Sequence, residues 1–286
     1  MEKIQTLIQL TRLNKPIGFM LLFWPCLWGL TLGYNFNLDI SLYKYYILLF
    51  FSGSVLMRSA GCIVNDIVDK SLDRKVKRTK KRPIASGKVS IFESLIYVVS
   101  FCFLALFILI QFNLLTIILG FASMILVFSY PLMKRITYWP QLFLGLTFNW
   151  GIIMAWTAIN NYLAIEPIIL YISAIFWTLG YDTIYGLQDI RDDEIIGVKS
   201  TSIKFKNNLK FFVGICYILC ITCLLILGWF LEANRFYFIL LLIPIFQFMY
   251  QIKKFEKRDP DSCLKTFKSN NLQGFLIFLN LSILIY

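Results

Sequence analysis

Apolar residues in this chain gather in long blocks separated by short polar segments. Blocks of about 20 residues predict membrane-spanning helices, because a hydrocarbon core about 30 Å thick needs roughly that helical length. We expect nine such spans, at 17–34, 45–65, 90–110, 113–130, 140–158, 166–187, 211–231, 234–251 and 271–286. The expected fold class is an all-α, polytopic membrane protein.

The composition agrees with that pattern. Of the 286 residues, 58% are apolar and 15% are charged, whereas a soluble domain is about half apolar and about a quarter charged. A soluble fold is therefore excluded. The chain also contains no histidine, which excludes a histidine general base, histidine-ligated metal and Ser-His-Asp chemistry.

Positive charge lies on one side of the predicted bundle. If the N-terminus is cytoplasmic, the segments on that side hold 25 of the 28 lysines and arginines. The positive-inside rule then places the C-terminus on the opposite side. The net charge of +12 therefore orients the helices and does not indicate a nucleic-acid partner. The segments counted are 1–16, 66–89, 131–139, 188–210 and 252–270.

The two longest of these segments, 66–89 and 188–210, follow the second and the sixth predicted spans. This spacing predicts one domain, 1–286, with two related halves of four helices and a ninth helix. Pro25 and Pro244 fall inside spans, where we expect kinks.

Half of the 16 acidic residues gather at the ends of these two helices. Asp66, Asp69 and Asp73 step by three and four residues, which predicts one acidic face at the cytoplasmic end of the second helix. A second group repeats the stepping at the end of the sixth helix and includes a phenol. Its members are Asp182, Tyr185, Asp189 and Asp193.

These positions are unfavourable unless a ligand compensates for them. A carboxylate at a helix C-terminus meets the negative end of the macrodipole. Asp182 is deeper, inside an apolar helix, where an ionised side chain costs roughly 2.5–3.5 kcal/mol. Mg²⁺ bound by carboxylates and substrate phosphates offsets such a cost. We interpret the two groups as a metal and phosphate site, with solvated helix ends as the alternative.

Cations accompany the carboxylates. Six lysines and arginines lie within 75–82, after the first acidic group, and Lys199 follows the second. A diphosphate is a ligand that binds a metal ion and cationic side chains at the same time. Arg58 lies about 12 Å deeper than Asp66 along the second helix, and a buried guanidinium needs an anion. The sequence leaves two possible partners for Arg58: a buried acid such as Asp182, or a substrate carboxylate beneath the diphosphate.

Together these residues resemble the UbiA superfamily of intramembrane aromatic prenyltransferases, most closely the branch that acts on 4-hydroxybenzoate in ubiquinone biosynthesis. The resemblance covers nearly the whole chain. It is most specific in the paired motifs NDxxDxxxD at 65–73 and DxxxD at 189–193. Further matching stretches are 12–18, 24–25, 58–66, 76–79, 82–87, 130–135, 140–141, 182–185, 197–201 and 271–274.

The resemblance implies a role for each group of residues. Arg58 takes the position associated with the aromatic carboxylate, and Tyr185 and Lys199 belong to the substrate site. The implied contacts of the diphosphate oxygens are Lys77, Arg78, Arg82 and Lys134. The implied ligands of Mg²⁺ are Asn65, Asp66, Asp69, Asp73, Asp189 and Asp193.

The implied fold is a ring of nine helices around a cavity that opens to the cytoplasmic side of a bacterial or mitochondrial inner membrane. The implied activity is Mg²⁺-dependent transfer of a polyprenyl group from polyprenyl diphosphate to 4-hydroxybenzoate, ortho to the hydroxyl. The base that removes the ring proton stays open between Asp182, another acid of the site and the diphosphate itself.

Other functions are not excluded by the residues alone. Within the same chemistry, the acceptor could be a naphthoate, homogentisate, haem or a chlorophyllide, although Arg58 favours a small carboxylated ring. A different class is a secondary transporter for an organic anion. Dependence on Mg²⁺ distinguishes the enzyme from the transporter.

Overall fold

The computed structural model describes residues 2–285, and this part of the chain contains helices and turns but no strand. The all-α fold class is confirmed. Within the described part, eight segments are long and apolar enough to cross a membrane. They are α2 (Ile17–Asn37), α3 (Ile40–Val68), α5 (Ile91–Leu109), α6 (Leu114–Ile136), α7 with α8 (Pro140–Asn149, Gly151–Asn160), α9 (Ile165–Gly186), α12 (Leu209–Phe230) and α13 with α14 (Arg235–Leu240, Leu242–Lys254).

The expected ninth span corresponds to a shorter helix. α16 covers Asn270–Leu281 and continues into a 3-10 turn, η1, at Ser282–Ile285, while Tyr286 lies outside the described residues. Twelve residues rise only about 18 Å, less than the hydrocarbon thickness. α15 (Pro260–Lys268) precedes α16 with one residue between them. The ninth span and the two related halves remain predictions.

The two prolines expected to kink their spans act differently. α2 passes through Pro25 as one helix. α13, by contrast, ends at Leu240, and α14 begins at Leu242. The carbonyl of Leu240 is four residues before Pro244, which is the carbonyl that a proline ring displaces. The expected disruption near Pro244 therefore takes the form of a break.

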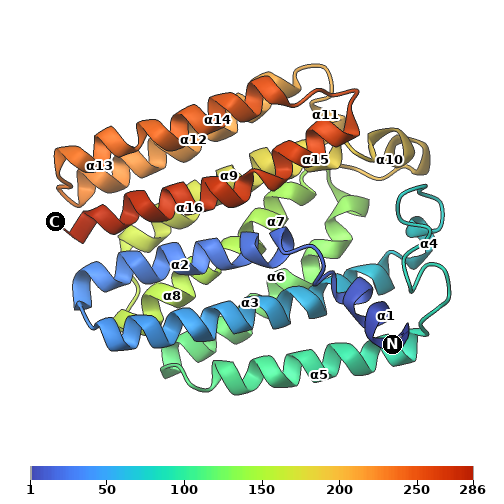
Figure 1. The fold of residues 1–286 in the computed structure, drawn as a ribbon, viewed down its shortest axis with the longest axis horizontal. Coiled ribbons are helices and arrows are strands. Elements are labelled where there is room, and N and C mark those ends of the chain that lie inside the picture. Colours follow the sequence, from blue (N-terminus) through green and yellow to red (C-terminus); the bar gives the residue numbers. More distant parts are fainter. Residues whose placement is uncertain (1, 286) are drawn as a thin grey trace.

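The hydrophilic segments meet at one end of the bundle. Figure 1 shows α1 (Glu2–Thr11), α4 (Lys70–Asp73), α10 (Ile190–Ile196) and α11 (Thr201–Lys204) at the end that carries the N-terminus, with the C-terminus at the opposite end. The two acidic motifs are far apart in sequence but share this end. The membrane side that this end faces remains a prediction.

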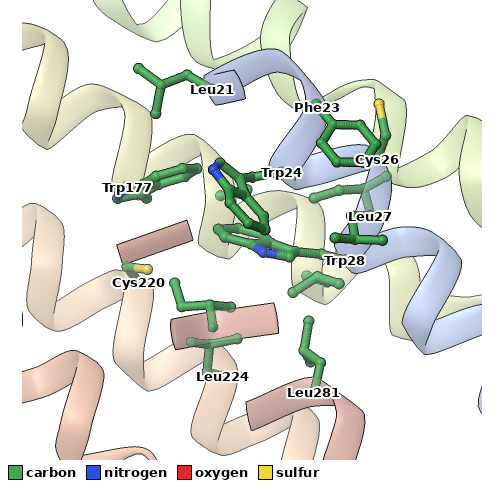
Figure 2. Close-up of a cluster of buried hydrophobic side chains, with 14 of the residues drawn as sticks. Leu21, Phe23, Trp24, Cys26, Leu27, Trp28, Trp177, Cys220, Leu224 and Leu281 are labelled. Carbon is green, nitrogen blue, oxygen red and sulfur yellow. The ribbon is translucent and has the colours of Figure 1, made fainter. Parts of the chain in front are cut away.

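Tryptophans attach α16 to the core. Trp28 of α2 and Trp177 of α9 pack with ring centroids 4.9 Å apart (Figure 2). The indole N–H of Trp28 donates to the Gly274 carbonyl at 2.9 Å, and that of Trp177 donates to Asn270 Oδ1 at 2.8 Å. Trp24 donates likewise to Asn271. Polar groups at the start of α16 thus find partners inside an apolar bundle, where helices associate through close packing and interhelical hydrogen bonds.

Candidate active site

The first acidic motif surrounds a helix break. α3 ends at Val68, Asp69 is its C-cap, and α4 begins at Lys70. The expectation of three aspartates on one uninterrupted helix face is therefore wrong. Asp66, Asp69 and Asp73 are instead 2%, 2% and 7% exposed, so solvated helix ends do not describe this motif. The carboxylates nevertheless stay close to one another, since one nitrogen of Arg82 donates to both Asp66 and Asp73.

Each buried aspartate has a cationic partner. Asp66 Oδ1 accepts from Arg12 at 2.5 Å and from Arg82 at 3.0 Å, and Arg82 also donates to Asp73 at 2.8 Å. Asp69 pairs through Oδ2 with Lys134 of α6. Burial raises the pKa of Asp69, and the Lys134 ammonium opposes that rise. The positive charges offset the cost of removing these carboxylates from water.

The second motif lies beyond the end of α9. That helix ends at Gly186, and Asp189 precedes α10, so the expected stripe on a single helix is again interrupted. Arg78 donates to both oxygens of Asp189, at 2.8 and 3.0 Å from Nε, and its guanidinium carbon lies 5.7 Å from the Tyr185 ring centre. Burial, followed by the neighbouring charge of Asp189, raises the pKa of Asp193 to about 6.

The basic segment after α4 connects the two motifs. Besides the Arg78 pair, the backbone N–H of Lys77 donates to Asp192 Oδ2 at 3.0 Å. The side chain of Lys77 itself is exposed. The loop and the second motif are thus joined by contacts between residues 111 or more positions apart in sequence. The positive charge of the loop is needed for this, because two carboxylate motifs repel each other.

The carboxylates do not converge on a single point. Among the described residues, no group of three acids or cysteines is close enough to hold a metal ion. One oxygen of the first motif nevertheless has no donor: Asp69 Oδ1 is buried and accepts no hydrogen bond, and Arg135 Nη2 lies 4.0 Å from it. A buried carboxylate oxygen of this kind suits a hard divalent cation, which prefers oxygen ligands. Asp69 Oδ1 is therefore the oxygen in the motifs that fits such a cation.

A cavity of about 1460 Å³ extends from the motifs into the bundle. Its charged part includes Arg12, Asn65, Asp66, Arg78 and Arg82. The remainder is lined mainly by aromatic and aliphatic side chains of the spanning helices, among them Phe50, Phe103, Phe112, Phe121, Met124 and Met154. This volume exceeds the 300–1,000 Å³ of ordinary small-molecule pockets, so the cavity can accept a ligand with a charged head and a long apolar chain.

Arg58 lines the same cavity below the charged part. Its guanidinium carbon lies 5.3 Å from the ring centre of Phe148, and its Nε would be 2.9 Å from a Cβ placed on Gly18. In the described part of the chain, no carboxylate lies within 4.0 Å of it, Asp182 included. Of the two partners left open by the sequence, the buried acid is not in ion-pair contact.

A model of the UbiA prenyltransferase family matches residues 22–280. The chain belongs to the UbiA prenyltransferase family. It is 41% identical over 280 residues to a 4-hydroxybenzoate octaprenyltransferase of Psychromonas ingrahamii, covering 98% of this chain and 96% of the relative. It is 42% identical over 282 residues to a mitochondrial 4-hydroxybenzoate polyprenyltransferase of Bos taurus, covering 97% and 75%. The resemblance seen in the sequence is confirmed.

Solved UbiA structures share the fold. An apo UbiA homologue from Aeropyrum pernix K1 superposes with a TM-score of 0.76 at 19% identity, covering 91% of this chain and 96% of that chain. A UbiA homologue from Archaeoglobus fulgidus, bound to GPP and Mg²⁺, gives a TM-score of 0.71 at 16% identity, covering 98% and 99%. This multi-pass membrane fold is therefore the one expected of a UbiA protein.

A smaller polar pocket adjoins the main cavity of this UbiA protein. Its volume is about 150 Å³, and Asn65, Asp182 and Tyr130 line both spaces. Lys134, Asp193 and Lys199 line only the smaller one. The Lys199 ammonium donates to the Ile136 carbonyl at 3.1 Å, so Lys199 reaches the end of α6 and not the first acidic motif.

Sequence reasoning missed three cations that line the cavity, namely Arg12, Lys15 and Lys268, whereas Lys81 belongs to the basic run 75–82. Arg12 and Lys15 belong to a stretch that carried the family resemblance, but no role followed from their position before the first span. A cation in a loop has no periodicity by which its direction can be read. Only the folded chain shows that these side chains face the cavity.

Proposed function

We propose that this UbiA protein transfers a polyprenyl group from polyprenyl diphosphate to 4-hydroxybenzoate, ortho to the hydroxyl, and releases diphosphate, as a membrane step of ubiquinone biosynthesis. One observation carries the proposal: a single cavity has a charged mouth, then Arg58 with no carboxylate within 4.0 Å among the described residues, then an apolar length. That order matches a diphosphate, a carboxylated ring and an isoprenoid chain. The names of relatives about 40% identical support the same reaction.

The divalent cation of the proposed reaction is Mg²⁺. Its proposed ligands are Asn65, Asp66, Asp69, Asp73, Asp189 and Asp193, and the donor-free Asp69 Oδ1 supports this assignment. The A. fulgidus homologue, whose structure holds Mg²⁺ together with GPP, supports the choice of Mg²⁺ as the metal. When bound, Mg²⁺ neutralises charge on the diphosphate oxygens.

The cations of the site stabilise the leaving group. Arg78, Arg82 and Lys134 now pair with the motif carboxylates, and in the substrate complex they donate to diphosphate oxygens. Negative charge develops there as the allylic carbon–oxygen bond breaks, so donors fixed at that point lower the barrier. Lys77 contributes its backbone N–H and a nearby positive charge, and Tyr185 orients the Arg78 guanidinium.

The apolar cavity protects the allylic cation that remains. Aromatic side chains such as Phe121 and Phe148 present π-faces to a cation and exclude water. The planar fork of Arg58 fits a carboxylate through two parallel hydrogen bonds, so it holds the acceptor ring beneath the breaking bond. The ring attacks through the carbon ortho to its hydroxyl, and Asp182, a motif carboxylate or the released diphosphate takes the ring proton.

We propose that the end carrying both motifs faces the cytoplasm of a bacterium, or the matrix in a mitochondrion, with the C-terminus on the opposite side. The distribution of lysines and arginines supports this orientation. The diphosphate and 4-hydroxybenzoate then reach the mouth from the aqueous phase, while the isoprenoid chain remains in the bundle and the bilayer.

The proposal is tested with purified protein in lipid, supplied with Mg²⁺, 4-hydroxybenzoate and polyprenyl diphosphates of several lengths. Mass spectrometry is expected to find prenylated 4-hydroxybenzoate and free diphosphate, and EDTA is expected to abolish both. Folded protein that forms no product with 4-hydroxybenzoate would disprove the acceptor assignment. Movement of unchanged acid across the bilayer, independent of EDTA, would indicate a transporter.

A further inference from the structure

Arg58 lies in the cavity wall without a polar partner from the protein. It belongs to α3, inside a membrane-spanning segment. Among the described residues, none accepts a hydrogen bond from its guanidinium, and no carboxylate lies within 4.0 Å of it. A guanidinium carries five N–H donors in a rigid plane. The orientation of that plane therefore depends on packing, and its donors are left to a ligand.

Two neighbours from other helices supply the packing. The guanidinium carbon of Arg58 lies over the ring of Phe148 in α7, 5.3 Å from the ring centre. The second neighbour is Gly18 in the first turn of α2. A Cβ added there would lie 2.9 Å from Arg58 Nε, 3.5 Å from Nη2 and 3.6 Å from the guanidinium carbon. Gly18 thus borders the planar group itself and not its aliphatic stem.

The missing side chain at Gly18 leaves room for this arrangement. Ordinary contacts of a Cβ begin at 3.4 Å, so alanine would displace the guanidinium by about 0.5 Å, the tolerance within which a binding site must hold its groups. The three nearest atoms all belong to Arg58, and they form the far end of a flexible side chain. The fold can therefore accept alanine here by moving the guanidinium alone.

Other close glycines of this chain serve helix packing instead. A Cβ at Gly29 would lie 2.4 Å from the backbone oxygen of Ile152, and one at Gly228 would lie 2.2 Å from the ring of Tyr237. Tyr237 is fully buried, so alanine at these positions overpacks the core and costs stability. At Gly18 the crowded neighbour is a charged group that lines the cavity. Alanine at Gly18 thus alters the site and not the core.

We infer that Gly18 is a positioning residue for the acceptor: its bare backbone lets the Arg58 guanidinium lie against α2 and over Phe148, with its N–H groups directed to the acceptor carboxylate. The inference rests on the proposed function for the identity of that carboxylate. A guanidinium that is already ordered loses little freedom when the acid binds. Position 18 therefore determines how well the site distinguishes a carboxylate from a neutral group.

Gly18→Ala tests this role in purified protein in lipid, with Mg²⁺ and saturating polyprenyl diphosphate. We expect kcat/KM for 4-hydroxybenzoate to fall about tenfold or more, the effect of misplacing a binding group, while the KM for polyprenyl diphosphate changes much less. The unfolding temperature should be unchanged or raised, because alanine favours a helix more than glycine does.

Gly53→Ala is the matched control. Gly53 is another glycine of the cavity wall, in α3. The nearest atom to its Cβ would be Ile108 Cγ2, at 4.0 Å, so this methyl group reaches no guanidinium. Gly53→Ala should keep the parent's KM for 4-hydroxybenzoate. An equal loss in Gly53→Ala and Gly18→Ala would overturn the inference, since any methyl group on the wall would then have the same effect.

A double-mutant cycle with Arg58→Ala separates positioning from a structural role. If Gly18 acts through the guanidinium, Gly18→Ala should lower kcat/KM for the acid in the parent but not in the Arg58→Ala background. Gly18→Ala should also lose discrimination against 4-hydroxybenzamide. Equal losses in both backgrounds, or unchanged discrimination, would overturn the inference. A parent protein that forms no product with 4-hydroxybenzoate would instead reject the proposed acceptor, and the inference with it.

Discussion

Arg78 and Asp189 form a two-pronged ion pair across 111 residues of sequence, with Arg78 Nε 2.8 and 3.0 Å from the two carboxylate oxygens. Arg78 lies in the loop after α4, and Asp189 precedes α10. The pair therefore connects the two acidic motifs at the mouth of the cavity. A diphosphate that binds between the motifs must take over this guanidinium.

Replacing Arg78 tests that relationship. We expect Arg78→Ala to raise the KM for polyprenyl diphosphate about 10- to 100-fold, because a charged hydrogen bond to the ligand is lost. The free energy of unfolding should change by about 1 kcal/mol or less, since the Arg78 side chain is 37% exposed. Steady-state kinetics and thermal unfolding measure the two quantities. Lys80→Ala, an exposed cation two residues away, is the control and should leave the KM unchanged.

Asp69 is expected to be indispensable for the metal. Asp69→Asn keeps the shape of the side chain and leaves Lys134 facing a neutral amide. We expect kcat to fall at least 100-fold and the Mg²⁺ concentration for half-maximal rate to rise, since an amide is a weaker ligand than a carboxylate. Titration of activity with Mg²⁺ measures both.

The same chemical change at the far end of α3 is the control for Asp69. Asp39 caps that helix by accepting from the backbone N–H groups of Ser41 and Leu42, and asparagine caps a helix equally well. Asp39→Asn should therefore keep its Mg²⁺ dependence. A normal Mg²⁺ titration in Asp69→Asn would remove Asp69 from the proposed ligands.

Arg58 is expected to select the acceptor. Arg58→Ala should raise the KM for 4-hydroxybenzoate about 10- to 100-fold and change the KM for polyprenyl diphosphate much less, because the guanidinium lies below the charged mouth. The parent protein should discriminate strongly against 4-hydroxybenzamide, whereas Arg58→Ala should not. Equal effects on both substrates, or unchanged discrimination against the amide, would contradict the assignment.

Close approach of α16 to α2 is expected to limit substitution at Gly274. A Cβ at that position would lie 2.5 Å from two ring atoms of Trp24, so Gly274→Ala should destabilise the protein by about 1–3 kcal/mol through overpacking. Gly214→Ala in α12 is the control, because the nearest atom to its Cβ would be 3.9 Å away. It should be neutral or slightly stabilising. Thermal unfolding in detergent compares the two.

Hydropathy located most helices to within a few residues, because the lipid bilayer imposes the same requirements on every spanning segment. A segment that crosses a bilayer must satisfy its backbone groups internally and remain apolar for about 20 residues, whatever its neighbours are. α9 and α12 therefore appear in the sequence almost as they do in the fold. The short α16 is the exception: it begins at Asn270, close to the expected position, but ends at Leu281, where a 3-10 turn follows.

The acidic motifs were visible because carboxylates are rare in such a chain, but their geometry was not. Helical stepping predicted continuous stripes, whereas α3 ends at Val68 and α9 ends at Gly186. Helical spacing alone assumes an uninterrupted helix and takes no account of contacts with the rest of the chain. Arg82, which contacts Asp66, lies in the basic run seen in the sequence, but Arg12 and Lys134, which contact Asp66 and Asp69, come from other helices or segments that no local pattern connects to the motif.

The sequence by itself determined the membrane fold class, the approximate spans, the family and the types of residue that carry the chemistry, since each of these depends on local composition or on motifs short enough to read along the chain. Only the tertiary structure decided which cation meets which carboxylate, that Arg58 has no acidic partner within 4.0 Å among the described residues, and that Arg12 reaches the site. Those outcomes depend on the packing of helices distant in sequence, because the interactions between charges act over a few ångströms of space and not along the chain.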